Sequence, residues 1–204
     1  MASISDNELS EIVKTVLDRV QGGGDEPKDN IDAIQSLSED IAQVKEKPGA
    51  TSDKRIIAIG TDHGGYEMKE GLKAYLGELG YSIVDCGTYS KDSVDYPDYA
   101  EKVADLVKDG GAWRGIMIDG AGIGSCMAAN KVPGVRAAMC YDHATAVNSR
   151  EHNNANVLTL GAGLIGKSLC EQIVKTWLET DFGGGRHARR VDKIDAIAAR
   201  YSKN

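Results

Sequence analysis

The chain has 204 residues, a formal net charge of −7 and an aromatic content of 5 %, which suits one domain of ordinary size plus an appendage. No run approaches the roughly 18 apolar residues that a membrane span needs, so we expect no membrane protein. The first residues show no secretory signal pattern, and the acidic balance disfavours nonspecific binding to nucleic acid.

The charge is unevenly distributed along the chain. Residues 1–53 contain 12 acidic and 5 basic side chains, a net charge of −7, whereas residues 54–204 contain the remaining 19 of each sign. The sequence therefore predicts three segments: an amphipathic helix over 1–21, an acidic linker with a second short helix over 22–53, and the main domain over 54–204.

The predicted first helix, over residues 5–20, begins at a capping box formed by Ser5 and Glu8. Glycines 22–24 end it, because they cannot hold a helix against backbone entropy. One apolar stripe runs along the helix at Leu9, Ile12, Val13, Val16, Leu17 and Val20. Such a short helix is marginal alone in water, so we expect it to find a partner surface.

From residue 54 onward, short apolar runs alternate with helical stripes. The strands are predicted at 55–60, 82–86, 115–119, 135–140 and 156–160. The helices are predicted at 65–79, 97–109, 122–130, 143–151, 167–180 and 188–201. This alternation predicts an α/β fold, a three-layer α/β/α (Rossmann-like) arrangement with a five-stranded parallel sheet.

The four cysteines form no CxxC pair, and no histidine lies at zinc-ligand spacing from them. We expect free, packed thiols in a reducing cytoplasm. They are Cys86, Cys126, Cys140 and Cys170.

Ligands of such sheets bind outside the carboxyl ends of the strands, and polar clusters are expected to gather there. Gly120, Gly122 and Gly124 follow the third strand, where small residues let backbone N–H groups approach an anion. A tight turn without a ligand explains them equally well, and the spacing is not that of a dinucleotide fingerprint. Asp119, directly before them, is either a general base or a helix cap.

A second cluster combines histidines and arginines. Arg186, Arg189 and Arg190 lie beside three glycines, and guanidinium groups favour a phosphorylated ligand, although a solvated helix start would look the same. Three of the four histidines, His63, His152 and His187, fall in these polar clusters, which we expect to converge on one face. The fourth, His143, is expected at the surface.

Taken in order, these motifs resemble the ribose-5-phosphate isomerase B and galactose-6-phosphate isomerase family of aldose–ketose isomerases. The resemblance covers about residues 54–200. The residues that carry it are Gly60–Gly65, Gly87–Tyr89, Val94–Pro97, Gly124–Ala137, Arg150–Asn153, Gly184–His187 and Arg190–Asp192.

The resemblance implies a dimer or higher oligomer that interconverts aldose and ketose phosphates through a cis-enediol at sites shared between subunits, without metal or cofactor. By position, His152 would assist ring opening and Asp119 would occupy the place of the base. The other implied contacts are Asp62, His63 and Tyr96 with sugar or phosphate, Asn153 beside His152, Arg186, His187 and Arg190 with phosphate, and the N–H groups of Gly120, Gly122 and Gly124 with the enediolate.

The chain departs from the family at the catalytic centre. Ribose enzymes often carry a cysteine base at Asp119 and a Thr or Ser at Ala121, another branch has a glutamate base at Ser125, and many members have an arginine at Gly163. Two interpretations stay open: Asp119 replaces the cysteine, or the protein binds sugar phosphate as a non-catalytic partner subunit or regulatory module. A nucleotide-binding regulator is a third, weaker hypothesis.

The amino-terminal helix and linker resemble the encapsulation peptides that target enzymes into bacterial microcompartments. Residues 5–20 would then bind a shell or cargo protein through their apolar face, and the cytoplasmic enzyme would lie inside a microcompartment. A helix packed on its own core, or used in oligomerisation, is the alternative. Membrane binding is disfavoured because the polar face is acidic.

Overall fold

The computed structural model describes residues 55–201, so the predicted helix at 5–20 and the acidic linker lie outside the described residues. Five parallel strands form one sheet in the order β2-β1-β3-β5-β4. The strands are β1 (Ile56–Thr61), β2 (Ser82–Asp85), β3 (Arg114–Asp119), β4 (Ala137–Met139) and β5 (Val157–Gly161).

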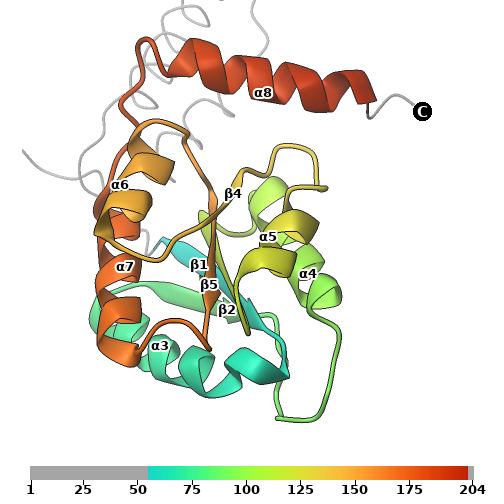
Figure 1. The fold of residues 1–204 in the computed structure, drawn as a ribbon, viewed down its shortest axis with the longest axis vertical. Coiled ribbons are helices and arrows are strands. Elements are labelled where there is room, and N and C mark those ends of the chain that lie inside the picture. Colours follow the sequence, from blue (N-terminus) through green and yellow to red (C-terminus); the bar gives the residue numbers. More distant parts are fainter. Residues whose placement is uncertain (1–54, 202–204) are drawn as a thin grey trace, which may run out of the picture. The chain divides into compact units, whose positions relative to one another are not determined.

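Helices cover both faces of this sheet (Figure 1). They are α3 (Tyr66–Glu78), α4 (Tyr96–Lys108), α5 (Ile123–Ala129), α6 (His143–Glu151), α7 (Lys167–Glu179) and α8 (Ala188–Tyr201), with a 3-10 turn, η1, at His63–Gly65. On one face α3, α6 and α7 pack on Ile57 and Ile59 of β1. On the other, α4 and α5 pack around Ala58. The predicted three-layer α/β/α fold is confirmed.

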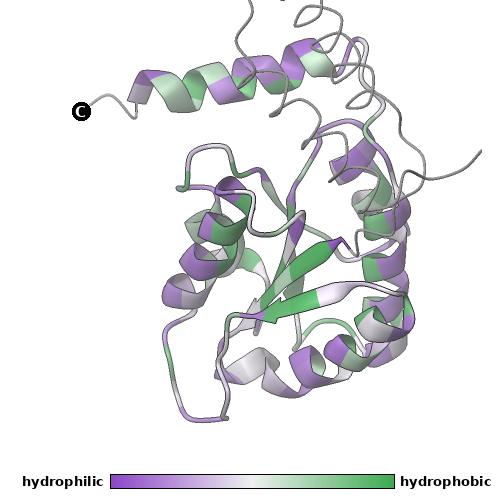
Figure 2. Ribbon diagram, turned by 180° about the vertical axis from the view of Figure 1, so that it is seen from behind, coloured by the Kyte–Doolittle hydropathy of each residue, from purple (hydrophilic) through white to green (hydrophobic). Residues whose placement is uncertain are grey.

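Alternation within the central strands explains the two cores. In β3, Ile116 and Ile118 join the α3/α6/α7 core, while Met117 between them joins the α4/α5 core. All of β3 and β5 is buried, and Figure 2 shows the hydrophobic sheet between helices whose hydrophilic residues face outward. Strands buried on both faces read as continuous apolar runs, which is why they were recognisable in the sequence.

The strand order places a topological switch between β1 and β3. From β1 the chain crosses through α3 to β2 on one side, and α4 then returns it on the other face to β3. The carboxyl ends of β1 and β3 are therefore adjacent, with helices leaving to opposite faces. In open α/β sheets this crevice is where ligands bind.

Helix α8 differs from the others in its packing. Within the described residues Val191 is its one buried side chain, and an ion pair of 3.2 Å between Asp195 and Arg136 fastens it beside β4. Ile194, Ile197 and Tyr201 remain exposed. Among residues 55–201, no helix is both long and apolar enough to cross a bilayer.

Candidate active site

The turn after β1 is ordered by the carboxylate of Asp62. Its Oδ1 accepts hydrogen bonds from the amides of Gly64 (2.9 Å) and Gly65 (3.2 Å), which caps η1. His63, the residue after Asp62, is exposed. Its Nδ1 lies 3.2 Å from both the amide nitrogen and the carbonyl oxygen of Val94. A short acidic cap thus leaves an imidazole at the carboxyl edge of the sheet.

The turn after β3 is ordered in the same way by Asp119. Its Oδ1 accepts from the amides of Ala121 (2.7 Å) and Gly122, and its Oδ2 accepts from the amide (3.0 Å) and hydroxyl (2.6 Å) of Ser125. Asp119 is 4 % exposed and Ser125 is fully buried. The carboxylate therefore bonds its own turn and, through Ser125, the first turn of α5. This is the structural role of a cap, which the sequence offered as the alternative to a base, although the N-cap residue itself is Gly122.

The three glycines of this turn differ in what a side chain at each position would meet. Gly122 has a φ of 78°, and a Cβ there would lie 2.9 Å from the backbone of Leu160, so the tight turn demands it. A Cβ on Gly124 would lie 2.4 Å from the ring of Tyr96, whereas one on Gly120 would meet nothing within 4 Å. Gly120 therefore leaves open space where a ligand could approach the backbone.

Tyr96 and the two turns form one cluster at the carboxyl edge. The ring of Tyr96 contacts Gly124, and a Cβ on Gly64 would lie 3.6 Å from the amide nitrogen of Gly120. We call this set the carboxyl-edge group. Its members are Asp62, His63, Tyr96, Asp119, Gly120, Gly122 and Gly124.

The remaining predicted residues meet elsewhere. The rings of His152 and His187 stack with centroids 4.1 Å apart and planes 6° apart, because the amide of Gly183 bonds the carbonyl of Glu151 and brings the segment before α8 to the end of α6. We call this set the amino-edge group. Its members are His152, Asn153, Arg186, His187 and Arg190.

Two asparagines fix the orientation of His152. Asn153 Nδ2 donates to Asn148 Oδ1 (3.1 Å), which leaves Asn148 Nδ2 to donate to His152 Nδ1 (2.9 Å). A neutral His152 then carries its proton on Nε2. Asn148 and Asn153 also line a hollow of about 550 Å³ beside β4.

Two arginines and one carboxylate lie near the stacked pair: Arg186 and Arg190 are close to His187, and Glu151 Oε1 lies 3.9 Å from His152 Nε2. Partial burial, with His152 and the nearby Arg186 and Arg190, holds the pKa of His187 below its ordinary value. Within residues 55–201 neither arginine has a carboxylate at ion-pair distance, and His187 Nδ1 is buried without a hydrogen-bond partner. An anion here would supply the missing negative charge and an acceptor.

The two groups lie at opposite edges of the sheet, so the expectation that all polar clusters gather at the carboxyl ends is wrong. Helix α6 starts after β4 at the carboxyl edge and runs back, and His152 precedes β5 at the amino edge, where the amide of Asn156 bonds the carbonyl of Arg136. In Figure 1, α8 lies at one end of the domain and α3 at the other.

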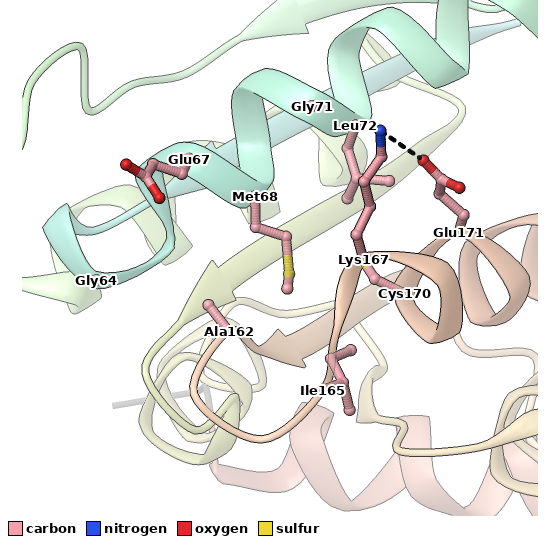
Figure 3. A pocket seen from close by; sticks show the side chains of 10 residues that line it. All are labelled: Gly64, Glu67, Met68, Gly71, Leu72, Ala162, Ile165, Lys167, Cys170 and Glu171. Atoms are coloured by element: carbon pink, nitrogen blue, oxygen red, sulfur yellow. Dashed lines mark ion pairs between the residues drawn. The ribbon is translucent and has the colours of Figure 1, made fainter.

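A pocket of about 360 Å³ lies between α3 and the start of α7 (Figure 3). Met68 points into it, and an ion pair of 3.7 Å between Lys167 and Glu171 borders it. Gly64 is its one contact with the β1 turn, and none of the predicted site residues lines it. We therefore assign the site to the two groups and not to this pocket.

Sequence reasoning missed Asn148, Lys69 and Arg114. Asn148 lies one helical turn before His152, a spacing that could have suggested contact. Lys69 shares a helical face with Leu72 and Leu76, and all three are buried, so its place on an apolar stripe was visible. Arg114 donates to the carbonyls of Trp177 (2.6 Å) and Leu178 (3.0 Å) at the end of α7, a contact with no local pattern.

Known proteins resemble this chain in sequence and in structure. The chain is 44 % identical over 144 residues to ribose-5-phosphate isomerase B of Escherichia coli, covering 71 % of this chain and 97 % of that one. It is 43 % identical over 142 residues to D-erythrulose-4-phosphate isomerase of Pectobacterium atrosepticum, covering 68 % and 91 %.

Among solved structures, ribose-5-phosphate isomerase B of Clostridium thermocellum matches with a TM-score of 0.71 and 52 % identity, over 72 % of this chain and 99 % of that one. The sequence model of the Ribose/Galactose Isomerase family matches residues 57–194. This range contains all five strands except the first residue of β1, and both groups of candidate site residues. The chain belongs to the ribose/galactose isomerase family.

Proposed function

We propose that this sugar-phosphate isomerase interconverts ribose 5-phosphate and ribulose 5-phosphate, or a related aldose–ketose pair, through a cis-enediol. Family membership supports the reaction class. The observation that carries the proposal is the pair of groups. One places His63 and Tyr96 beside a glycine turn. The other stacks two histidines next to arginines that have no carboxylate at ion-pair distance within the described residues.

In this proposal the amino-edge group binds the phosphate and opens the sugar ring. Arg186, His187 and Arg190 hold the phosphate, because guanidinium groups bind it bidentately. His152 donates its Nε2 proton to the ring oxygen. Asn148 supports this role, since its hydrogen bond to Nδ1 leaves the proton on the other nitrogen.

The carboxyl-edge group handles the open-chain sugar. Asp62, His63 and Tyr96 contact its hydroxyl groups. Of the turn's N–H groups, those of Ala121 and Gly122 are engaged by Asp119. Donation to the enediolate oxygen therefore falls to Gly120 and Gly124, next to the ring of Tyr96.

We propose that one complete site combines groups from two chains. The two groups lie at opposite edges of the sheet within one chain, and one small sugar phosphate cannot contact both. In a two-fold dimer the amino-edge group of one chain would face the carboxyl-edge group of the other, and two equal sites would form.

The proposed base is Asp119. It would take the proton from C2 of the aldose and return it to C1, while the hydroxyl proton moves from O2 to O1, so that no atom is gained or lost. For this step the carboxylate must release Ser125, whose hydroxyl is 2.6 Å away. That engagement favours the second candidate function, a non-catalytic sugar-phosphate-binding subunit, if the carboxylate stays in its turn.

The deciding experiment follows a panel of phosphorylated aldoses and ketoses by NMR in the presence of the purified chain. Isomer exchange with ribose 5-phosphate, together with deuterium incorporation from solvent at the transferred position, supports the proposal. Binding of ribose 5-phosphate without exchange of any tested sugar selects the non-catalytic function instead. Binding of a dinucleotide but no sugar phosphate contradicts both.

We also propose that residues 1–21 direct this cytoplasmic enzyme into a bacterial microcompartment. The support is the sequence alone: an apolar stripe on an acidic helix joined to the enzyme by a linker. A fluorescent protein carrying residues 1–24 should form puncta in cells that make shells. As a matched control, the same fusion with Leu9, Val13 and Leu17 changed to serine should be diffuse, and a diffuse signal from both fusions contradicts targeting.

A further inference from the structure

One lysine lies entirely inside the domain, next to the carboxyl-edge group. Lys69, in the first turn of α3, is fully buried, and its Nζ donates to both oxygens of Asp85 (2.7 and 2.9 Å) and to the carbonyl of Thr88 (2.8 Å). Glu70 lies 3.2 Å away. Lysine is almost never fully buried unless it is paired, and removing a buried partner is costly, so this ammonium is held in one place.

The lysine fastens the loop that follows β2. Asp85 ends β2 and also accepts from the amide of Gly87 (2.9 Å). The amide of Thr88 bonds the carbonyl of Thr61 (2.8 Å), and the amide of Thr61 bonds the carbonyl of Gly87 (2.7 Å). Residues 87 and 88 are therefore held between Lys69 and the last residue of β1, immediately before Asp62.

The far end of the same loop bonds His63 of η1 and leads directly into Tyr96 of α4, which are two proposed substrate contacts. Val94 bonds His63 through its backbone, and Tyr96 contacts Gly124. Between residues 89 and 95 the loop buries no side chain. A loop with so little burial depends on its few polar contacts for order: Lys69 makes the contact at its start, and Lys91 pairs with Glu67 of α3 in its middle.

Charge within this cluster is balanced. Burial raises the pKa of Asp85, but the hydrogen bonds from Lys69 and Lys73 outweigh it and hold that pKa below its ordinary value. Lys73 Nζ lies 2.7 Å from the same carboxylate, yet its side chain is 32 % exposed, and its hydrogen bonds go to Asp85 and Glu70 rather than to Thr88. The two lysines thus share the carboxylates of Asp85 and Glu70, and of the two, Lys69 bonds the loop.

We propose that Lys69 is a positioning residue of the isomerase site: it holds the loop over residues 87–95 so that His63 and Tyr96 lie where they contact the sugar. This inference rests on the proposed function. It assigns no proton transfer to Lys69, which lies beneath the loop and has no contact with the open side of the turns.

The test compares Lys69→Met with Lys73→Met in the full chain. Methionine keeps the length and most of the volume of the buried lysine, and Asp85 retains Lys73 as a partner, so Lys69→Met should fold. Lys73→Met is the matched control because it removes a cation from the same carboxylate and leaves the bond to Thr88 intact.

Two readouts separate positioning from stability. The first is native-state trypsin cleavage after Lys91, whose side chain is 64 % exposed within the loop, followed by mass spectrometry. The second is KM and kcat for ribose 5-phosphate at a temperature where both variants are folded. We expect Lys69→Met to raise cleavage and KM by about tenfold, and Lys73→Met to change neither by more than about twofold.

Each other result has a defined meaning. A lower apparent kcat with unchanged KM would show that Lys69 affects only the fraction of the protein that is folded. Unchanged trypsin cleavage would show that Lys69 does not hold the loop. Either result overturns the inference. If the unaltered chain binds ribose 5-phosphate without turnover, its Kd replaces KM. If the unaltered chain does not bind it, the proposed function fails and this inference fails with it, whatever the cleavage pattern.

Discussion

At the scale of single residues, the main chemical question is whether the carboxylate of Asp119 acts as a base or as a cap. It follows a buried strand, a position visible in the sequence, but only the structure shows that it accepts four hydrogen bonds from its own turn. The sequence could not distinguish a base from a cap, because both need an acidic side chain between a strand and a glycine turn.

Asp119→Asn tests the base. Removal of a general base costs about 10²- to 10⁴-fold in rate, so we expect a kcat reduced by that much and a Kd for ribose 5-phosphate within about twofold of the original. Ser125→Ala is the control: it removes one donor and keeps the carboxylate, and kcat should stay within about threefold. Turnover retained by Asp119→Asn would exclude the base role.

The stacked histidines predict a pH dependence of stability. The folded-state pKa of His187 is lowered by partial burial and by His152, Arg186 and Arg190, whereas the unfolded chain takes up this proton near pH 6.5. As pH falls below that value, the unfolded state binds more protons and the folded state is destabilised. His187→Asn should therefore lose less stability than the original chain between pH 7 and pH 5.

Urea unfolding midpoints at the two pH values measure this difference. His143→Asn provides the control, since His143 is exposed at the start of α6 and its replacement should leave the original pH dependence. An equal loss of stability in all three proteins would mean that the surroundings of His187 do not disfavour its protonation.

At the scale of elements, the sequence predicted strands and helices well because the central strands are continuous apolar runs. Strand β4 is shorter than predicted, 137–139 in place of 135–140. Arg136 instead gives its amide to Asn156 Oδ1 (2.7 Å), a contact that local pattern cannot reveal. The position of His152 at the amino edge, in contrast, was deducible, because a helix between parallel strands must return to that edge.

Contact between α4 and α5 gives a test at this scale. Gly124→Ala would place a methyl group 2.4 Å from the ring of Tyr96, and the end of that side chain must move. We expect KM for ribose 5-phosphate to rise by about tenfold while the fold is kept. Gly120→Ala is the control for packing, since a Cβ there meets nothing within 4 Å, and its melting temperature should be unchanged. Equal KM values for Gly124→Ala and the original chain would contradict a role for the Tyr96 position.

At the scale of the whole molecule, the main feature is that the candidate site residues form two groups at opposite edges of the sheet. Their residues were predictable one by one from motifs, but their separation depends on the direction of α6 and on the bond between Gly183 and Glu151. The direction of α6 was deducible, but no local pattern encodes that the segment before α8 reaches the end of α6. The uneven charge belongs to residues 1–53, so the net charge of −7 does not describe the site, where arginines surround the histidine pair.

Complementation between two inactive variants measures the central claim, an isomerase site built from two chains. His63→Ala damages the carboxyl-edge group and His152→Ala the amino-edge group, so each variant alone should lose nearly all isomerisation of ribose 5-phosphate. After co-refolding at equal amounts, half of the dimers are mixed and each has one intact site of two, which predicts about a quarter of the original activity. A mixture no more active than its components would contradict the account.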